Sequence, residues 1–298
     1  MTATSSPAAR SAVRPPVRPS RISATSPRRR SAAIAAYLVL ALVALAFLLP
    51  FGWLFLASVS DKATLGTAIP DHPTLRNFSE VLTGDNLHAL INSLVLSLGS
   101  ALLTLVLAAP AAYPLSRYGR RFGRPILLGL LFATGLPITA ILVPVYGLFV
   151  QLDLLDSVPA TTLFLTATGL PMAIWLMKNF MDEVPISLEE AAWVDGASAF
   201  RALLRIVLPL MLPGVTVVFT FTFALTWGNF FVPFILLVDP AKQPASVAIY
   251  QYFGLHGTAS YGLLAAFSIL YSMPVVVLYT LVQRVLGNAF ALSGAVKG

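Results

Sequence analysis

The charged side chains with the most informative spacing lie close together, in a chain that is otherwise mostly apolar. Glu189, Glu190 and Asp195 come first, and Arg201 and Arg205 follow after a glycine. No histidine or cysteine lies nearby in the sequence to tune a carboxyl pKa, so general acid–base catalysis by the two glutamates is disfavoured. The chemistry that these residues suit is the electrostatic docking of a partner protein.

Two short helices are predicted to position these charges. Ser187 stands three residues before Glu190, a spacing that predicts a capping box at the start of the first helix. Gly196 can adopt the left-handed conformation that ends a helix, and Ser198 is placed to cap a second helix. Prolines further along the chain then close the unit. The sequence therefore predicts a helix with acids, a turn and a helix with bases.

The first of these helices has small side chains beside its acids. Ala191 and Ala192 let a partner surface approach closely, while Glu189, Glu190 and Asp195 fix its orientation through charge. The same residues also fit a solvated loop in which Glu190 does no more than cap the helix. On local chemistry alone, both interpretations stand.

Composition places the chain in a membrane. Of its 298 residues, 57% are hydrophobic and only 10% are charged, whereas soluble domains carry about 25% charged residues. There is no cysteine, which excludes disulfides and thiolate ligands, and the three histidines have no metal-ligand spacing. We expect no catalytic residue, no metal and no cofactor in this chain. The net charge of +7 is explained by membrane topology rather than by nucleic-acid binding.

Long uncharged stretches predict an all-α membrane protein with six transmembrane helices. Each stretch meets the requirement of about 20 residues for crossing the hydrocarbon core. They cover residues 32–60, 89–114, 125–150, 158–177, 210–238 and 261–283. Residues 1–31 are rich in arginine and proline and contain no acid, which predicts a disordered basic tail in the cytoplasm. Residues 32–298 then form one permease domain, with the charged loop at 182–209.

The distribution of positive charge orients this domain. All but three of the 19 lysines and arginines lie in segments that share one side, and the exceptions are Lys62, Arg76 and Lys242. Because basic residues concentrate in cytoplasmic loops, the N- and C-termini and the charged loop are predicted to be cytoplasmic. No charged residue lies well inside a span, which disfavours an ion-coupled secondary carrier.

Uncharged polar residues within the spans are candidates for a translocation path. These are Asn92 and Ser93 early in the second span, and Trp227 and Asn229 in the fifth. Amide groups can hydrogen bond to a hydroxyl-rich solute, and an indole ring can stack on a sugar face. The same groups also suit hydrogen bonds between helices, which contribute about 0.6 kcal/mol on average.

The charged loop resembles the EAA loop in the membrane subunits of bacterial ABC importers. The residues that fit its pattern without a gap are Glu190, Ala191, Ala192, Gly196, Ile206, Leu208 and Pro209. In that family the loop forms the coupling helices that sit in a cleft of the ATPase subunit. The resemblance implies the type I importer permease (MetI-like) fold. Glu189 and Asp195 are not part of the pattern, but their charges predict that they also take part in coupling.

Further segments are similar to the carbohydrate importer permeases of the maltose-transport type, in particular to their smaller, MalG-like subunit. They are the pair Asn92 and Ser93, residues 111–113 with Arg117, Trp227 with Asn229, and residues 294–298. This resemblance implies a complex in the bacterial inner membrane with a second, MalF-like permease, a homodimeric cytoplasmic ATPase and an extracytoplasmic solute-binding protein. It also implies that Lys297 reaches the ATPase and that residues 239–260 meet the binding protein.

No G-x-x-x-x-G-K-[ST] phosphate loop occurs in the chain, so ATP and Mg are expected on the partner ATPase. The predicted function is therefore that of a permease subunit that moves a sugar or oligosaccharide into the cytoplasm. Three alternatives remain: an importer of a non-sugar solute such as a polyamine or phosphate, an ion-coupled secondary carrier, and a membrane scaffold that moves no solute.

Overall fold

The computed structural model describes residues 27–66, 69–118, 123–253 and 260–295. These residues fold into helices and connecting turns, without a strand among them. The chain divides into two compact units, one that ends at Phe51 and one that begins at Gly52. The first helix, α1 (Pro27–Ser58), begins at Pro27. Residues 27–31 are therefore helical rather than part of a disordered tail, and residues 1–26 lie outside the described residues.

Most of α1 has the length and composition of a membrane span. The stretch from Ile34 to Ser58 is suitable for crossing the bilayer, and none of its most apolar part is buried within the chain. The leucines, valines and phenylalanines in residues 34–51 are instead exposed. Such a helix is stable only where lipid or another protein covers it.

Three further helices are long and apolar enough to cross a membrane singly. They are α3 (Gly84–Arg117), α6 (Val158–Asp182) and the part of α13 (Tyr261–Ala295) up to Arg284. With α1, they confirm four of the six predicted spans as single helices among the described residues. Their apolar surfaces suit a hydrocarbon environment, in which each helix satisfies its own backbone hydrogen bonds.

The other two predicted spans are bent pairs of helices. The pair α4 (Gly123–Thr134) and α5 (Ile138–Gln151) is bent by 86°. The helix over residues 199–210 and α10 (Leu212–Trp227) are bent by 84°. Pro137 precedes α5 and Pro213 lies in the first turn of α10, where the missing N–H leaves no helical hydrogen bond unmade. Counting each pair as one span gives the predicted six.

The predicted fifth span does not continue as one helix to Val238. It ends at Trp227, and a short helix, α11 (Phe231–Leu236), follows after a break. The carbonyls of Ala224 and Thr226 accept hydrogen bonds from Gly228 N, and Asn229 N also bonds the carbonyl of Thr226. These bonds close the last turn of α10 and redirect the chain.

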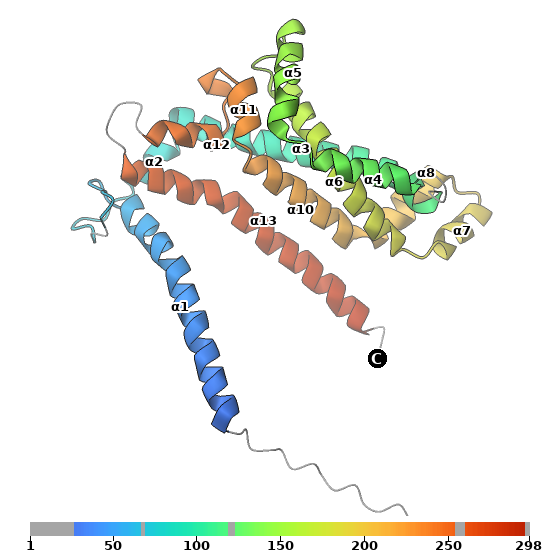
Figure 1. The fold of residues 1–298 in the computed structure, drawn as a ribbon, viewed down its shortest axis with the longest axis horizontal. Coiled ribbons are helices and arrows are strands. Elements are labelled where there is room, and N and C mark those ends of the chain that lie inside the picture. The colour runs from blue at the N-terminus through green and yellow to red at the C-terminus, as the bar shows by residue number, and fades with distance from the viewer. Residues whose placement is uncertain (1–26, 67–68, 119–122, 254–259, 296–298) are drawn as a thin grey trace, which may run out of the picture. The chain divides into compact units, whose positions relative to one another are not determined.

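The remaining elements are short and connect the long helices. They are α2 (Arg76–Val81), α7 (Ser187–Val194), α8 (Ala199–Ala202), the π-helix η1 (Leu203–Val207), α9 (Leu208–Leu210), the 3₁₀-helices η2 (Pro240–Lys242) and η3 (Ile249–Phe253), and α12 (Ala245–Ala248). Figure 1 shows α7 and α8 together at one end of the second unit, with α11 and α12 away from them.

The core of the second unit lies where α3, α6 and α10 pack side by side (Figure 1). Ala108 and Ala112 of α3 and Ala173 of α6 are fully buried, because small side chains let helix backbones approach closely. Phe180 of α6 packs tightly against α10 at Gly214, where an added Cβ would lie 2.4 Å from Cγ of Phe180. This core holds the ends of the helices that carry the charged loop.

An aromatic stack joins α10 to α13. The ring of Trp227 stacks on Phe223 and on Tyr271, with centroids 5.5 and 5.1 Å away. Trp227 Nε1 donates to the carbonyl of Tyr271 at 3.1 Å, and the Tyr271 hydroxyl donates to the carbonyl of Trp227. The two residues therefore hold each other through reciprocal hydrogen bonds as well as ring contact.

Candidate functional site

The first helix of the charged loop is α7, and it begins differently from the prediction. Its N-cap is Ile186, and the side chain of Ser187 makes no capping hydrogen bond. The carbonyl of Pro185 already accepts the Leu188 N–H, so the first turn has started before Ser187 is reached. The predicted capping box between Ser187 and Glu190 is therefore wrong.

The turn after α7 agrees with the sequence prediction. Gly196 has a φ of +84°, in the left-handed region that glycine adopts without a side-chain penalty. The Ala197 N–H returns to the carbonyl of Ala192 at 2.9 Å, which satisfies a free carbonyl at the end of the helix. The Ser198 hydroxyl then accepts the Arg201 N–H at 3.3 Å and caps α8, as predicted.

The second helix of the loop runs from Ala199 to Leu210 and contains one widened π turn, η1. Pro209 follows this turn. Its ring crowds the carbonyl four residues earlier and it cannot donate a hydrogen bond, which accounts for the irregular geometry. Leu203 and Val207 face the core and are buried, while Leu208 is half-buried and Pro209 is exposed. An apolar cavity of about 630 Å³ lies beside Leu208 and Pro209.

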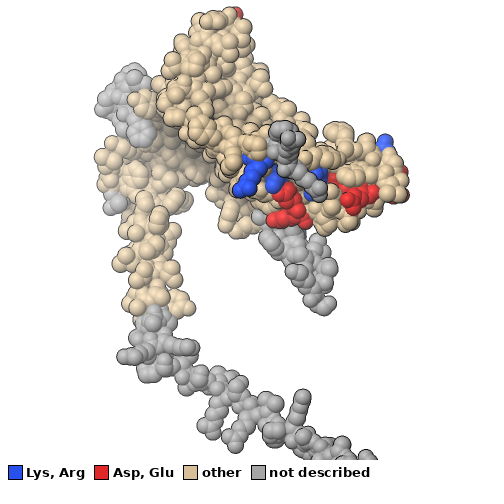
Figure 2. All heavy atoms as spheres, turned by 45° about the vertical axis from the view of Figure 1, so that its right-hand side comes forward, with Lys and Arg blue, Asp and Glu red and all other residues tan. Residues whose placement is uncertain are grey.

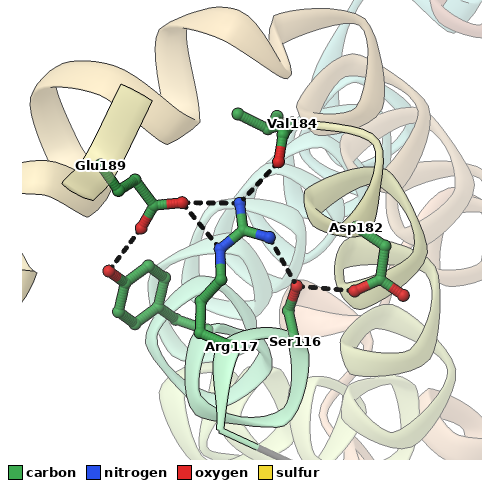
Figure 3. A network of polar contacts seen from close by, with 6 residues as sticks. Ser116, Arg117, Asp182, Val184 and Glu189 are labelled. Atoms are coloured by element: carbon green, nitrogen blue, oxygen red, sulfur yellow. Dashed lines mark hydrogen bonds and ion pairs between the residues drawn. The ribbon is translucent and has the colours of Figure 1, made fainter. Parts of the chain in front are cut away.

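A buried ion pair attaches α7 to the end of α3 (Figure 3). Glu189 is 0% exposed, and its Oε1 lies 2.7 Å from Nε and 2.6 Å from Nη2 of Arg117. Its other oxygen, Oε2, accepts the Tyr113 hydroxyl at 2.6 Å. Both carboxylate oxygens are therefore used within the chain. We call Tyr113, Arg117 and Glu189 the inner network.

The inner network extends to the end of α6. Arg117 Nη2 also donates to the carbonyl of Val184 at 3.1 Å, and its Nη1 donates to the Ser116 hydroxyl at 3.3 Å. That hydroxyl donates to Oδ1 of Asp182 at 2.6 Å, and the other oxygen of Asp182 pairs with Lys178 one turn earlier on α6. The ends of α3 and α6 and the start of α7 are thus linked by side-chain contacts (Figure 3).

Local helix geometry explains why these residues meet. Tyr113 and Arg117 are four residues apart on α3, so they lie on the same face of the helix. Arg117 lies in the last turn of α3 and Glu189 in the first turn of α7, the positions where helix dipoles favour a positive and a negative charge. Burying two charges is costly, but here each charge faces the other and further hydrogen bonds.

The exposed side of α7 carries a different set of residues. Glu190, Ala191 and Asp195 are exposed, and Val194 is 88% exposed. We call these four residues the docking face. Figure 2 shows acidic and basic side chains gathered in one part of the visible surface, with a broad uncharged surface elsewhere. The two adjacent glutamates are thus separated by direction: Glu189 faces the spans and Glu190 faces outwards.

Asn92 and Ser93, predicted for a translocation path, hold a loop at the other end of α3. Asn92 Nδ2 donates to the carbonyls of Ala241 and Gln243 at 2.9 and 3.2 Å. The Ser93 hydroxyl accepts the Ala245 N–H at 2.8 Å. We call these contacts the outer tethers, because they fix the segment that contains η2 and α12.

Trp227 and Asn229 also have partners within the chain. Trp227 is only 4% exposed because of the aromatic stack. Asn229 Oδ1 accepts the Val232 N–H at 3.1 Å, and its carbonyl accepts the Ser246 hydroxyl at 2.9 Å. The structure therefore brings Asn92, Ser93 and Asn229 to one segment, residues 239–248, and places Trp227 in the helix packing.

The sequence did not predict two further contacts in this region. Asp156 has a φ of +58°, and its Oδ1 accepts the Asp239 N–H at 2.7 Å. The Tyr252 hydroxyl donates to Oδ1 of Asn86, and burial raises the pKa of Tyr252 to about 12. An aspartate before a serine is common in turns and gave no specific signal.

Lys297 lies outside the described residues, which hold no cluster of possible metal ligands.

Comparison with known protein families identifies the family of this chain. The family of binding-protein-dependent transport system inner membrane components matches residues 103–291, more than half of the sequence, and the chain belongs to this family. The trehalose transport system permease protein SugB of Mycobacterium tuberculosis is 31% identical over 84% of this chain and 93% of that protein. The glucose import system permease protein GlcU of Saccharolobus solfataricus is 30% identical over 88% of this chain and 95% of that protein.

A solved structure confirms the fold. A bacterial ABC transporter that is involved in the import of the acidic polysaccharide alginate contains a chain that aligns with a TM-score of 0.75 and 22% identity. The alignment covers 87% of this chain and 98% of that chain. The predicted all-α membrane protein with the type I ABC importer permease fold is thus confirmed, as is the predicted membership of the importer permeases.

Proposed function

We propose that this chain is the membrane-spanning permease subunit of an ATP-driven importer that moves a carbohydrate into the cytoplasm. The single observation that carries the proposal is the docking face on α7, which presents two acids and an exposed valine beside the small Ala191. A short helix with these groups suits a cleft in a partner protein, because charge sets its orientation and small side chains permit close approach.

The proposed partners are those that the resemblance to maltose-type importers implies. We expect a second, MalF-like permease, two copies of a cytoplasmic ATPase that binds ATP and Mg, and an extracytoplasmic solute-binding protein. The chain lies in the bacterial inner membrane with both termini in the cytoplasm, because nearly all basic residues lie in segments that share that side. Lys297 near the C-terminus is proposed to reach the ATPase.

The proposed mechanism uses α7 as a lever. Closure of the ATPase dimer on ATP moves the docked helix, and the spans change between inward-open and outward-open states. Gly196 sets the angle between α7 and α8. The motif residues Ile206, Leu208 and Pro209 continue the second helix towards the bend before α10, so movement of the loop reaches that span.

The proposed solute class is a sugar or an oligosaccharide. It is supported by the relatives, whose names refer to trehalose and glucose, and by the resemblance to maltose-type permeases. Because Asn92, Ser93, Trp227 and Asn229 have partners within the chain, we propose that they support the outer segment that faces the binding protein. Direct solute contacts are then expected from the sister permease and from other exposed groups.

The test combines purification and transport. The complex is isolated from its native membrane in mild detergent, and uptake of labelled trehalose, maltose and glucose is measured after reconstitution with ATP inside the vesicles. An ATPase chain should copurify with the wild type, and much less of it with Glu190→Lys. Glu80→Lys is the matched control, because Glu80 is an exposed acid on α2, far from the docking face in the sequence.

Several outcomes would contradict the proposal. Uptake that needs no ATPase and stops when an ion gradient is collapsed would indicate a secondary carrier. If the copurified binding protein retains a polyamine or phosphate and no sugar is taken up, the transported solute is not a carbohydrate. An equal yield of ATPase with Glu190→Lys and with the wild type would remove the docking face from the mechanism.

A further inference from the structure

We propose that Arg117 and Tyr113 are positioning residues that fix α7 rigidly to the end of α3, so that the docking helix and the span move as one body. This inference rests on the proposed function, and it assigns a role to the inner network that the EAA pattern does not contain. Arg117 and Tyr113 lie more than 70 positions before Glu189 in the chain, and neither is part of the charged loop.

The packing around α7 is the first argument. Beyond the inner network, α7 packs mainly against α8 and η1, which belong to the same loop. A helix of eight residues held only by its own loop would transmit little force to the membrane spans. The completely buried Glu189 carboxylate attaches α7 to α3 through its ion pair with Arg117.

The direction of the hydrogen bonds is the second argument. Tyr113 and Arg117 donate from two sides to the two oxygens of one carboxylate, which fixes its rotation as well as its position. Arg117 also donates to Val184, in the connection between α6 and α7. One guanidinium therefore holds both the start of α7 and the chain segment that leads into it.

Burial is the third argument. The side chain of Arg117 is 5% exposed and that of Glu189 is 0% exposed, so solvent cannot replace either partner when the other is removed. Loss of either partner leaves a buried charge without compensation, which favours movement of the loop away from the spans. Mutations along an element that couples two sites change the coupling by roughly two- to thirtyfold, taken from about 0.5–2 kcal/mol.

The experiment measures the position of α7 directly. The chain has no cysteine, so spin labels can be attached to cysteines placed at Leu188 on α7, outside the docking face, and at Leu107 on α3, both of which are exposed. The distance between the labels is recorded by electron paramagnetic resonance in the assembled complex, without nucleotide and after trapping with ATP and vanadate. Sugar uptake per ATP hydrolysed is measured on the same preparations.

A narrow distance distribution is expected for the wild type in both states. Arg117→Ala should broaden it and lower uptake per ATP about two- to thirtyfold while ATP hydrolysis continues. The reversed pair, Arg117→Glu with Glu189→Arg, should narrow it again relative to either single variant. Lys242→Gln is the matched control, because it breaks the ion pair with Asp239 in the outer segment, which shares no residue with the inner network, and it should leave the distribution narrow.

Two results would overturn the inference. One is a distribution for Arg117→Ala as narrow as that of the wild type with unchanged uptake per ATP, and the other is equal broadening by Lys242→Gln. If Arg117→Ala does not assemble, Tyr113→Phe tests the inference instead, because it removes one hydrogen bond and no charge. A broader distance distribution in this variant would support the inference, and a distribution as narrow as that of the wild type would overturn it. The distance measurement needs no transported sugar, so it distinguishes failure of this inference from failure of the proposed solute class.

Discussion

Nη2 of Arg117 lies 2.6 Å from Oε1 of Glu189, and this ion pair joins the last turn of one membrane span to the first turn of α7. The neighbouring Glu190 is exposed on the other side of the same helix. Two consecutive glutamates thus serve two different contacts, one inside the subunit and one available to a partner. Substitutions at the two positions are expected to give different phenotypes.

The turn at Gly196 should tolerate no residue that is restricted to negative φ. Proline fixes φ near −65°, whereas Gly196 has +84°, so Gly196→Pro should preserve membrane insertion but uncouple ATP hydrolysis from uptake. Gly196→Ala should show a weaker form of the defect, because the left-handed conformation costs an alanine about 1–2 kcal/mol. Hydrolysis and uptake are compared in reconstituted vesicles.

The control for this turn is Gly129→Ala. Gly129 lies inside α4 without a positive φ, and an added Cβ meets no atom within 4 Å. Coupling should be normal in this variant. Wild-type uptake by Gly196→Pro would refute the role of the turn.

Gly214 should be required for the packing of α10 against α6. In Gly214→Ala the new Cβ would lie 2.4 Å from the Phe180 ring, so one helix must shift, and overpacking of this kind costs about 1–3 kcal/mol. The midpoint of thermal unfolding in detergent should fall. Adding Phe180→Ala should recover part of the loss, a non-additivity that would be absent if the two residues did not touch. Gly147→Ala, where nothing lies within 4 Å, serves as the control.

Trp227 should support helix packing rather than bind sugar. Trp227→Phe removes the Nε1 hydrogen bond to Tyr271, worth about 1 kcal/mol, and weakens the stack. We expect a lower unfolding midpoint with an unchanged half-saturation concentration for the transported sugar. A large rise in that concentration at unchanged stability would instead place the indole in the solute path.

The outer tethers should control the segment from Pro240 to Ala248. Asn92→Leu removes two hydrogen bonds, each worth about 1 kcal/mol, and should speed hydrogen exchange of the backbone amides in this segment. Basal ATP hydrolysis should not change, whereas stimulation by the binding protein should fall. Thr216→Val is a suitable control, since the Thr216 hydroxyl bonds only within its own helix. Unchanged exchange in Asn92→Leu would show that the segment is held by other contacts.

Much of the fold could be predicted because its signals are local. Apolar stretches are long enough to define the spans, and the positive φ of Gly196 and the Ser198 cap follow from the chemistry of single residues. The bends within two predicted spans were harder to predict from the sequence. A proline indicates where a helix can break, but it does not determine the angle of the bend. The capping box at Ser187 failed because Pro185 starts the helical turn earlier.

The inner network could not be predicted from the loop alone. Its partners lie on α3, and only the packing of α3 against α6 brings Arg117 to Glu189. An arginine that ends an uncharged span, one turn after a tyrosine, is a weak signal that many membrane proteins share. Likewise, Asn92 and Asn229 were candidates for a solute path, but the hydrogen bonds that join the Asn92 side chain and the Asn229 backbone carbonyl to residues 239–248 appear only in three dimensions.

The two ends of α3 hold contacts of different kinds. The helix has 34 residues and is therefore about 51 Å long, with the outer tethers near its start and the inner network at its end. The two sets share no residue and are too far apart to touch. Substitutions in the outer half of the helix can therefore adapt the subunit to a new solute without altering the contacts that couple it to the ATPase. Chimeras that exchange the outer half of α3 and its loop between relatives are accordingly expected to retain ATP coupling.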